Sequence, residues 1–155
     1  MLKLDHVVFP VADAGKTLAF YRDVLGLPLA ATHAGDDWDG YRWLMMVFAL
    51  AGGQQIVAVA LDGAPAPDDG GVARDARHYA MSVAAPAELA AWRTRLTRHG
   101  IEFREENHGE QDSIYFADPD GVVLEITSPP SAAMQDAAEA LAAVEHWLGR
   151  TKEPA

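Results

Sequence analysis

The chain has 155 residues, and half of them are apolar, which is enough for one domain or two closely packed modules with a sizeable core. It contains no cysteine, so disulfides, thiolate zinc sites and cysteine nucleophiles are excluded, and any site chemistry must use oxygen and imidazole groups. Twelve Lys and Arg against 23 Asp and Glu give a formal net charge of -11, which disfavours nucleic acid and anionic membranes as partners.

The first structural signal along the chain is an internal repeat. Residues 6–12 align without a gap with residues 78–84, at a constant offset of 72 (78 − 6 = 72). In both copies an apolar strand pattern is followed by a helix pattern that ends at a glycine suited to a left-handed cap, Gly26 or Gly100. The helix stripes that we expect to face the core are Leu18, Tyr21 and Leu25 in the first copy and Leu89, Trp92 and Leu96 in the second.

Two more strands around a turn complete each copy. The apolar runs are 43–50 and 55–61 in the first copy, and 113–117 and 122–127 in the second. The turn at 118–121, Asp-Pro-Asp-Gly, is the stronger hairpin signal because proline presets one dihedral angle and glycine accepts a positive φ. The unit is therefore βαβββ, present twice, and the predicted fold class is α+β, with the two modules forming a curved mixed sheet.

The domain organisation follows from this repeat. We assign module one to residues 1–62 and module two to 76–130, joined by a linker at 63–75 that is rich in Gly, Pro, Ala and Asp. Residues 131–155 form a C-terminal helix, expected over 131–148, and a tail. The apolar stripe of this helix would pack on its own domain or across a subunit interface.

Three side chains interrupt otherwise apolar strands and are candidates for metal ligands. His6 and His78 stand at equivalent repeat positions, so a pseudo-twofold axis would bring both to one cleft. Glu125 lies in an apolar strand, where its charge needs a positive partner. A lone strand histidine is usually a hydrogen-bonded structural group, but this combination favours a divalent metal. Two imidazoles and one carboxylate suit Fe²⁺ or Mn²⁺, and they also accept Ni²⁺, Co²⁺ or Zn²⁺.

Four motifs of this chain occur together in one known family. They are LDHVV at 4–8, FYRDVLGL at 20–27, HYA at 78–80, and YFADPDG followed by LEI within 115–126. Over about residues 2 to 128 the chain therefore resembles the vicinal oxygen chelate (VOC) superfamily, which includes glyoxalase I, extradiol dioxygenases, fosfomycin-modifying enzymes, methylmalonyl-CoA epimerase and metal-free bleomycin-binding proteins. The resemblance implies paired βαβββ modules around a cleft, a metal on His6, His78 and Glu125, and usually a homodimer.

Two departures from family patterns bear on the reaction. Glyoxalase I enzymes carry a fourth oxygen ligand where this chain has Val57 or Ala58, so that activity is disfavoured unless Gln54 or Gln55 takes the position.

The second departure concerns the fosfomycin enzymes. They bind a phosphonate through cationic and hydroxyl groups where this chain has Glu105, Gly109 and Met134, and an anion would here meet Glu105 and Glu106. A phosphonate substrate is accordingly disfavoured as well.

The remaining pattern is closest to that of the extradiol dioxygenases, which place a tyrosine ten residues before the carboxylate ligand. Tyr115 stands in this position relative to Glu125 (125 − 115 = 10). The family tyrosine orients or acidifies a substrate hydroxyl, so Tyr115 is the candidate catalytic residue. The alternative is a strand tyrosine with a surface hydroxyl. We expect His33, His99 and His108 at the surface, with His108 nearest to the cleft.

Two classes of function stay open. The first is a divalent-metal enzyme, closest to dioxygenase-like, that acts on a small substrate with vicinal oxygens, with glyoxalase or lyase-type and fosfomycin-resistance-type transferase activities as alternatives. The second is a metal-free cleft that sequesters a hydrophobic drug or peptide between Trp38, Tyr41 and Trp43. The two histidines and the glutamate favour the enzyme. The expected partners are a small molecule and a second copy, with no nucleic acid and no membrane, and the expected location is cytoplasmic.

Overall fold

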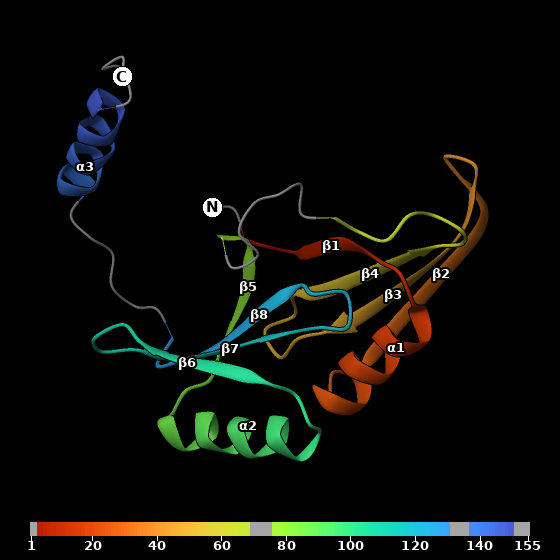
Figure 1. The fold of residues 1–155 in the computed structure, drawn as a ribbon, viewed down its shortest axis with the longest axis horizontal. Helices are drawn as coiled ribbons and strands as arrows, with labels where there is room; N and C mark the ends of the chain where they lie inside the picture. Colours follow the sequence, from red (N-terminus) through yellow and green to blue (C-terminus); the bar gives the residue numbers. More distant parts are fainter. Residues whose placement is uncertain (1–2, 69–75, 131–136, 151–155) are drawn as a thin grey trace.

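Figure 1 shows the computed structural model, which describes residues 3–68, 76–130 and 137–150. Module one consists of β1 (His6–Val11), α1 (Ala14–Leu18), η1 (Ala19–Val24), β2 (Leu29–Trp38), β3 (Tyr41–Ala49) and β4 (Gln55–Leu61). Module two consists of β5 (His78–Ser82), α2 (Pro86–Arg98), β6 (Phe103–Asn107), β7 (Asp112–Ala117) and β8 (Val123–Ser128), and α3 (Ala137–Arg150) follows.

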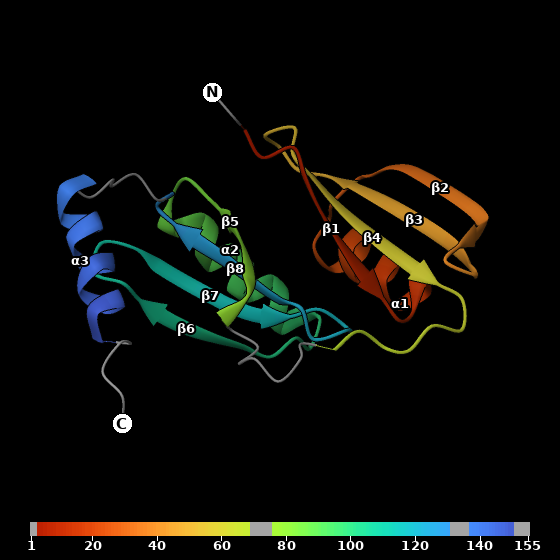
Figure 2. The ribbon, with the colours of Figure 1, turned by 90° about the horizontal axis from the view of Figure 1, so that it is seen from above.

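The two modules build the same sheet twice. The strand order is β1-β4-β3-β2 in module one and β5-β8-β7-β6 in module two. In each sheet the first strand runs parallel to the last strand of its module, and the other pairs are antiparallel. The predicted α+β class with two βαβββ modules and a C-terminal helix is confirmed, and within one chain the strands form two sheets that lie side by side in Figure 2.

Glycine determines where both long helices give way to strands. Gly26 and Gly100 have φ values of 75° and 69°, the left-handed conformation that the sequence predicts for a helix cap. The first helix differs from the prediction because α1 continues into the π-helical segment η1 before it reaches Gly26. A side chain at Gly26 would also meet the guanidinium group of Arg95 in α2, which would have to shift to make room for it.

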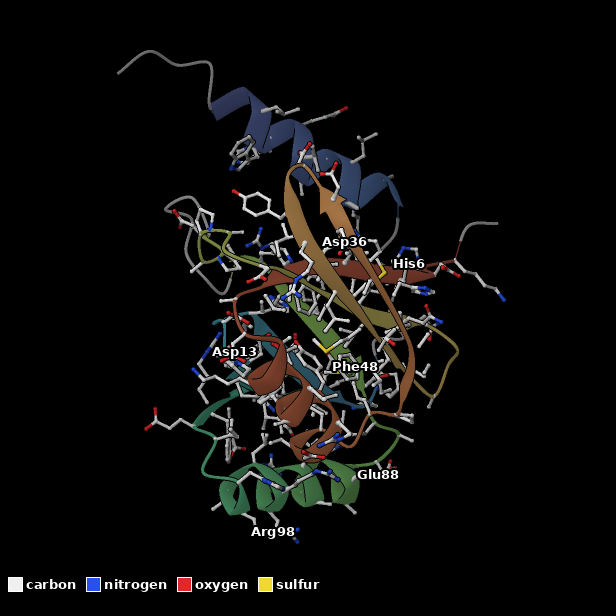
Figure 3. The ribbon with its side chains drawn as sticks, turned by 90° about the vertical axis from the view of Figure 1, so that its right-hand side faces the viewer. His6, Asp13, Asp36, Phe48, Glu88 and Arg98 are labelled. Atoms are coloured by element: carbon white, nitrogen blue, oxygen red, sulfur yellow. The ribbon has the colours of Figure 1, made fainter. Side chains whose placement is uncertain are left out.

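The main apolar core lies between the two sheets and their helices. It contains the expected helix residues Tyr21, Leu25, Leu89 and Leu96, and Leu18 and Trp92 pack against its edge. Figure 3 shows Phe48 of β3 between the module-one sheet and the helices. Because both helices contribute to one core, the two modules pack as one unit.

Polar contacts join the modules next to this core. The Tyr21 hydroxyl donates a 3.0 Å hydrogen bond to the buried carboxylate of Asp118, and the backbone N–H of Ala12 donates to Asp120. Burial, and then the charge of Asp118, raise the pKa of Tyr21 far above its usual range, so the hydroxyl stays a donor. Burial also raises the pKa of Asp118, although this carboxylate accepts three hydrogen bonds.

Helix α3 stands apart from both sheets at the module-two side in Figures 1 and 2. It ends at Arg150, in agreement with the sequence, where Gly149 and Arg150 follow the last stripe residue, and the predicted start at 131–136 lies outside the described residues. Leu141, Val144 and Leu148 of the predicted stripe are exposed, so a single chain does not bury it. Among the described residues, no helix is long and apolar enough to cross a membrane.

Tyr21→Phe tests the contact between the modules. The change removes the hydroxyl donor and leaves an oxygen of the buried Asp118 carboxylate without its partner, so we expect a loss of about 1–3 kcal/mol in the free energy of unfolding. Urea denaturation at neutral pH measures it, with Tyr41→Phe as the matched control in β3. A loss for Tyr21→Phe no larger than that of the control would show that the contact contributes nothing.

Candidate functional site

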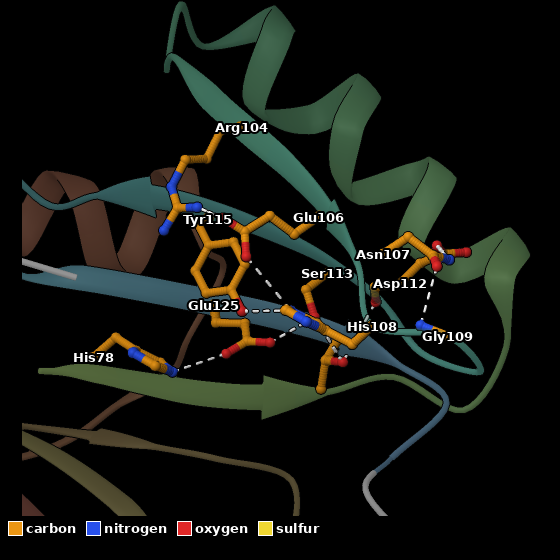
Figure 4. A network of polar contacts seen from close by, with 11 residues as sticks. His78, Arg104, Glu106, Asn107, His108, Gly109, Asp112, Ser113, Tyr115 and Glu125 are labelled. Atoms are coloured by element: carbon orange, nitrogen blue, oxygen red, sulfur yellow. Dashed lines mark hydrogen bonds and ion pairs between the residues drawn. The ribbon is translucent and has the colours of Figure 1, made fainter. Parts of the chain in front are cut away.

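A group of polar side chains lies on the module-two sheet face that is turned away from α2 (Figure 4). The strand register explains why they meet. Leu124, Ile126 and their neighbours point into the core against α2, so the alternate residues of the same strands point to the opposite face. The resulting rows are Arg104, Tyr115, Glu125 and Ala80 in one, and Glu106, Ser113, Thr127 and Ser82 in the next.

Glu125 is a buried carboxylate with two close partners. Its Oε1 accepts a 2.5 Å hydrogen bond from the hydroxyl of Ser113, and its Oε2 lies 3.0 Å from Nε2 of His78. Ser113 is itself buried and lies 3.0 Å from the hydroxyl of Thr127. Because Ser113 occupies Oε1, the other oxygen is the one directed toward His78. The structure thus brings together two of the three predicted metal ligands.

Tyr115 lies directly beside this pair. Its ring is edge-on to that of His78, with 5.7 Å between the ring centroids, and the guanidinium carbon of Arg104 lies over the ring, 4.3 Å from its centroid. Tyr115 is only 8% exposed, so the expected alternative of a surface hydroxyl does not describe it. Burial, and then a hydrogen bond with Glu125, raise the pKa of the Tyr115 hydroxyl, which keeps it protonated at neutral pH.

His108 reaches the same hydroxyl from the β6–β7 turn. Its Nε2 lies 3.1 Å from the Tyr115 oxygen and 3.6 Å from a carboxylate oxygen of Glu106. The turn is held in place because the backbone N–H of His108 donates to the carbonyl of Gln111, and that of Gly109 donates to the side chain of Asn107. Sequence reasoning expected a surface histidine near the cleft, and the turn geometry adds the contact with Tyr115.

His6 lies elsewhere in the single chain. It stands at the start of β1 on the module-one sheet (Figure 3), about half-exposed, with its Nδ1 2.7 Å from the carboxylate of Asp5. In one chain the described residues contain no group of three or more His, Asp or Glu side chains placed to share a metal ion. His78 and Glu125 therefore meet within one chain, and His6 does not join them there.

The structure revises the argument against an anionic substrate. Glu105 points to the α2 side, where Arg93 binds its carboxylate, and only Glu106 lies on the site face. Glu106 also forms an ion pair with Arg104 on that face. The expectation that both carboxylates would face the site was wrong, because adjacent strand residues point to opposite faces. Met134 lies outside the described residues.

The strand register also shows which residue occupies the position of the fourth metal ligand of glyoxalase I enzymes in module one. Glu125 pairs with Ala80, and the equivalent pair in module one is Val57 with Val8, so an apolar residue does occupy the position. Gln55, however, pairs with His6 and shares its face. The Gln55 side chain therefore lies in the same row as one of the predicted ligands.

The fold and this face define a two-module α+β protein in which a buried glutamate, Glu125, meets the more exposed His78 on the open face of one sheet. Residues 3–126 match the sequence pattern of the Glyoxalase/Bleomycin resistance protein/Dioxygenase superfamily. The chain belongs to this superfamily.

Individual relatives point in several functional directions. The chain is 31% identical over 126 residues to the glutathione transferase FosA of Serratia marcescens, covering 79% of this chain and 78% of that protein.

Among solved structures, a glyoxylase/bleomycin resistance protein/dioxygenase domain from Frankia sp. EAN1pec has a TM-score of 0.68 at 23% identity, with 82% and 97% of the two chains covered. A variant of the fosfomycin resistance protein FosX of Listeria monocytogenes, bound to Mn(II) and 1S,2S-dihydroxypropylphosphonic acid, has a TM-score of 0.62 at 20% identity, with 91% and 98% covered. These structures support the fold and do not select one activity.

Proposed function

We propose that this protein is a divalent-metal enzyme that acts on a small substrate with vicinal oxygens, with dioxygenase-like chemistry as the closest assignment. The observation that carries the proposal is the group of four side chains on one sheet face. His78 and Glu125 lie 3.0 Å apart, and Tyr115 and His108 lie 3.1 Å apart beside them. The first pair offers nitrogen and oxygen ligands, and the second offers proton donors and acceptors.

The chemistry of the donor set fits a metal. Glu125 is buried in an apolar strand, and a carboxylate there needs a positive charge nearby. A neutral imidazole and a carboxylate are ligands that Mn²⁺, Fe²⁺, Ni²⁺, Co²⁺ and Zn²⁺ share, and an open site that leaves room for two substrate oxygens favours Fe²⁺ or Mn²⁺. The Mn(II) bound to FosX supports this choice for a relative of the same fold.

The third ligand would come from His6 of a second copy. β1 and β5 are the first strands of their sheets and both are edge strands, and each begins with a histidine. A homodimer in which β1 of one copy approaches β5 of the other would bring His6 to the His78–Glu125 pair. Such a dimer would account for the observation that, in the described part of one chain, His78 and Glu125 meet without the third predicted metal ligand, His6.

The metal and the residues around it would have different roles in the reaction. A bound metal would supply Lewis acidity that lowers the pKa of the substrate hydroxyls. Ser113 holds Oε1 of Glu125, which leaves Oε2 for the metal. The protonated Tyr115 hydroxyl would donate a hydrogen bond to a substrate oxygen, and His108 would orient this hydroxyl from the solvent side.

Two alternatives have support from particular residues. Arg104 places a cation on the site face, and together with the FosA relationship this favours a transferase that accepts an anionic substrate. Gln55 beside His6 could supply an oxygen ligand to a glyoxalase or lyase-type site. Both alternatives keep the same metal site and differ in substrate.

The metal site predicts a graded loss of affinity among variants. We expect His6→Ala, His78→Ala and Glu125→Ala each to abolish tight Mn²⁺ binding, and Ser113→Ala to weaken it by about 10–100-fold because it releases Oε1. His99→Ala, at the exposed end of α2, should bind as the wild type does. Competition titration with a chelating dye measures each affinity, and circular dichroism checks the fold. Wild-type affinity in any ligand variant would remove that residue from the site.

Turnover tests the reaction class. Protein loaded anaerobically with ferrous iron should convert catechols in air, and Tyr115→Phe should lower kcat by roughly 100-fold or more with little change in iron affinity, since its hydroxyl acts on the substrate. Tyr41→Phe is the control. If the protein instead turned over methylglyoxal and glutathione with nickel or zinc, and left catechols unchanged with iron, the dioxygenase-like assignment would be wrong and the metal site would stand.

A further inference from the structure

Helix α3 presents an apolar side to solvent. Its four large apolar side chains, Leu141, Val144, Trp147 and Leu148, are 49% to 63% exposed. The helix stands apart from both sheets in Figures 1 and 2. An isolated helix of 14 residues is only marginally stable in water, and in proteins the packing of an amphipathic face supplies most of the stability of a helix. We therefore expect a partner to cover this side of α3.

The spacing of the apolar residues indicates which kind of partner fits. Leu141, Val144 and Leu148 follow one another at intervals of three and then four residues. In the sequence the same alternation continues back through Ala137 and Met134. A repeat of this period gives a narrow seam along one side of a helix, which is the pattern by which two helices pair side by side. A helix that covers a sheet usually has a wider apolar face.

The other candidates for a partner fit less well. Glu139 and Glu145 are acidic, whereas an amphipathic helix that binds an anionic membrane carries a basic polar face. The other large apolar side chains that are exposed among the described residues are Leu4, Val8, Leu29 and Trp38. None of these four lies on a helix. Within the described part of the chain, the seam of α3 is therefore matched by the α3 of another copy.

We propose that α3 pairs in antiparallel orientation with α3 of a second copy. When Leu141 of one helix lies opposite Val144 of the other, the two seams interlock about a twofold axis. Trp147 and Ala140 lie seven residues apart on the same flank of the seam, and this register places each opposite the other across the pair. The largest side chain of α3 thus meets one of the smallest. In a parallel pair Trp147 would face a position beyond Arg150, where α3 ends.

This contact does not depend on the proposed metal site. The proposed function joins two copies at β1 and β5, and α3 stands apart from both strands in Figures 1 and 2. Pairing of α3 therefore uses a different surface of the molecule and needs no metal. An experiment on α3 in the absence of metal tests the pairing alone.

Cross-linking of single-cysteine variants of the full chain tests the pairing, because the chain contains no cysteine of its own. In the antiparallel pair the two copies of residue 144 would be about 4.5 Å apart along the helix axis, and those of residue 148 about 16.5 Å apart. We expect a bismaleimide with a two-carbon spacer to convert Val144→Cys to a covalent dimer at micromolar concentration. Leu148→Cys should react roughly tenfold more slowly, since only collisions would bring its thiols together. The matched control, His146→Cys on the opposite side of α3, should be equally slow.

A second substitution tests whether the seam itself holds the pair. Leu141→Asp, added to Val144→Cys, should lower the rate of cross-linking to that of the control, because it puts a charge into the seam. His146→Asp, added in the same way, should leave the rate unchanged.

The possible outcomes are distinct. If Val144→Cys reacts no faster than His146→Cys, with both variants folded by circular dichroism, α3 does not pair with a second α3 and the proposal is wrong, whatever the metal titrations show. If Leu148→Cys reacts as fast as Val144→Cys, the helices pair in parallel and the antiparallel register is wrong. Fast reaction of Val144→Cys alone, lost with Leu141→Asp, supports the proposal.

Discussion

The buried charge of Glu125 is the constraint on which the arrangement of module two depends. The β8 strand is apolar on the side that packs against α2, so the carboxylate can be accommodated only on the opposite face. There Ser113 and His78 contact one oxygen of Glu125 each, and the ring of Tyr115 packs edge-on against the ring of His78. A carboxylate in a poorly solvated place is stabilised by a cation beside it, so this position favours a positive partner.

The packing of the modules determines what a single chain can do with this charge. Tyr21 and Asp118, together with the shared core, hold the helices of both modules against each other. The sheet faces that carry His6 and Glu125 are the faces not used in this packing. In the proposed dimer each copy would therefore contribute the face it leaves open, an aliphatic one from module one and a polar one from module two.

Much of this was predictable from the sequence, because the determining signals are local. The repeat offset located both βαβββ units, glycine located the helix ends, and a separation of ten residues across a tight hairpin placed Tyr115 opposite Glu125. Strand alternation also accounts for the opposite orientations of Glu105 and Glu106, which were expected to face the same side. The separation of His6 from His78 was not predictable, because it depends on how the modules pack, and neither was the reach of His108, which depends on its turn.

Mixing two inactive variants measures the central claim most directly. Copies with His6→Ala and copies with Glu125→Ala should each lack bound Mn²⁺. Refolded together in equal amounts, they should recover about one quarter of the wild-type metal content. About half of the dimers would contain one copy of each variant, and only one of the two sites in such a dimer would have an intact His6, His78 and Glu125. No recovery of metal in the mixture, with both variants folded and dimeric, would contradict a site shared between two copies.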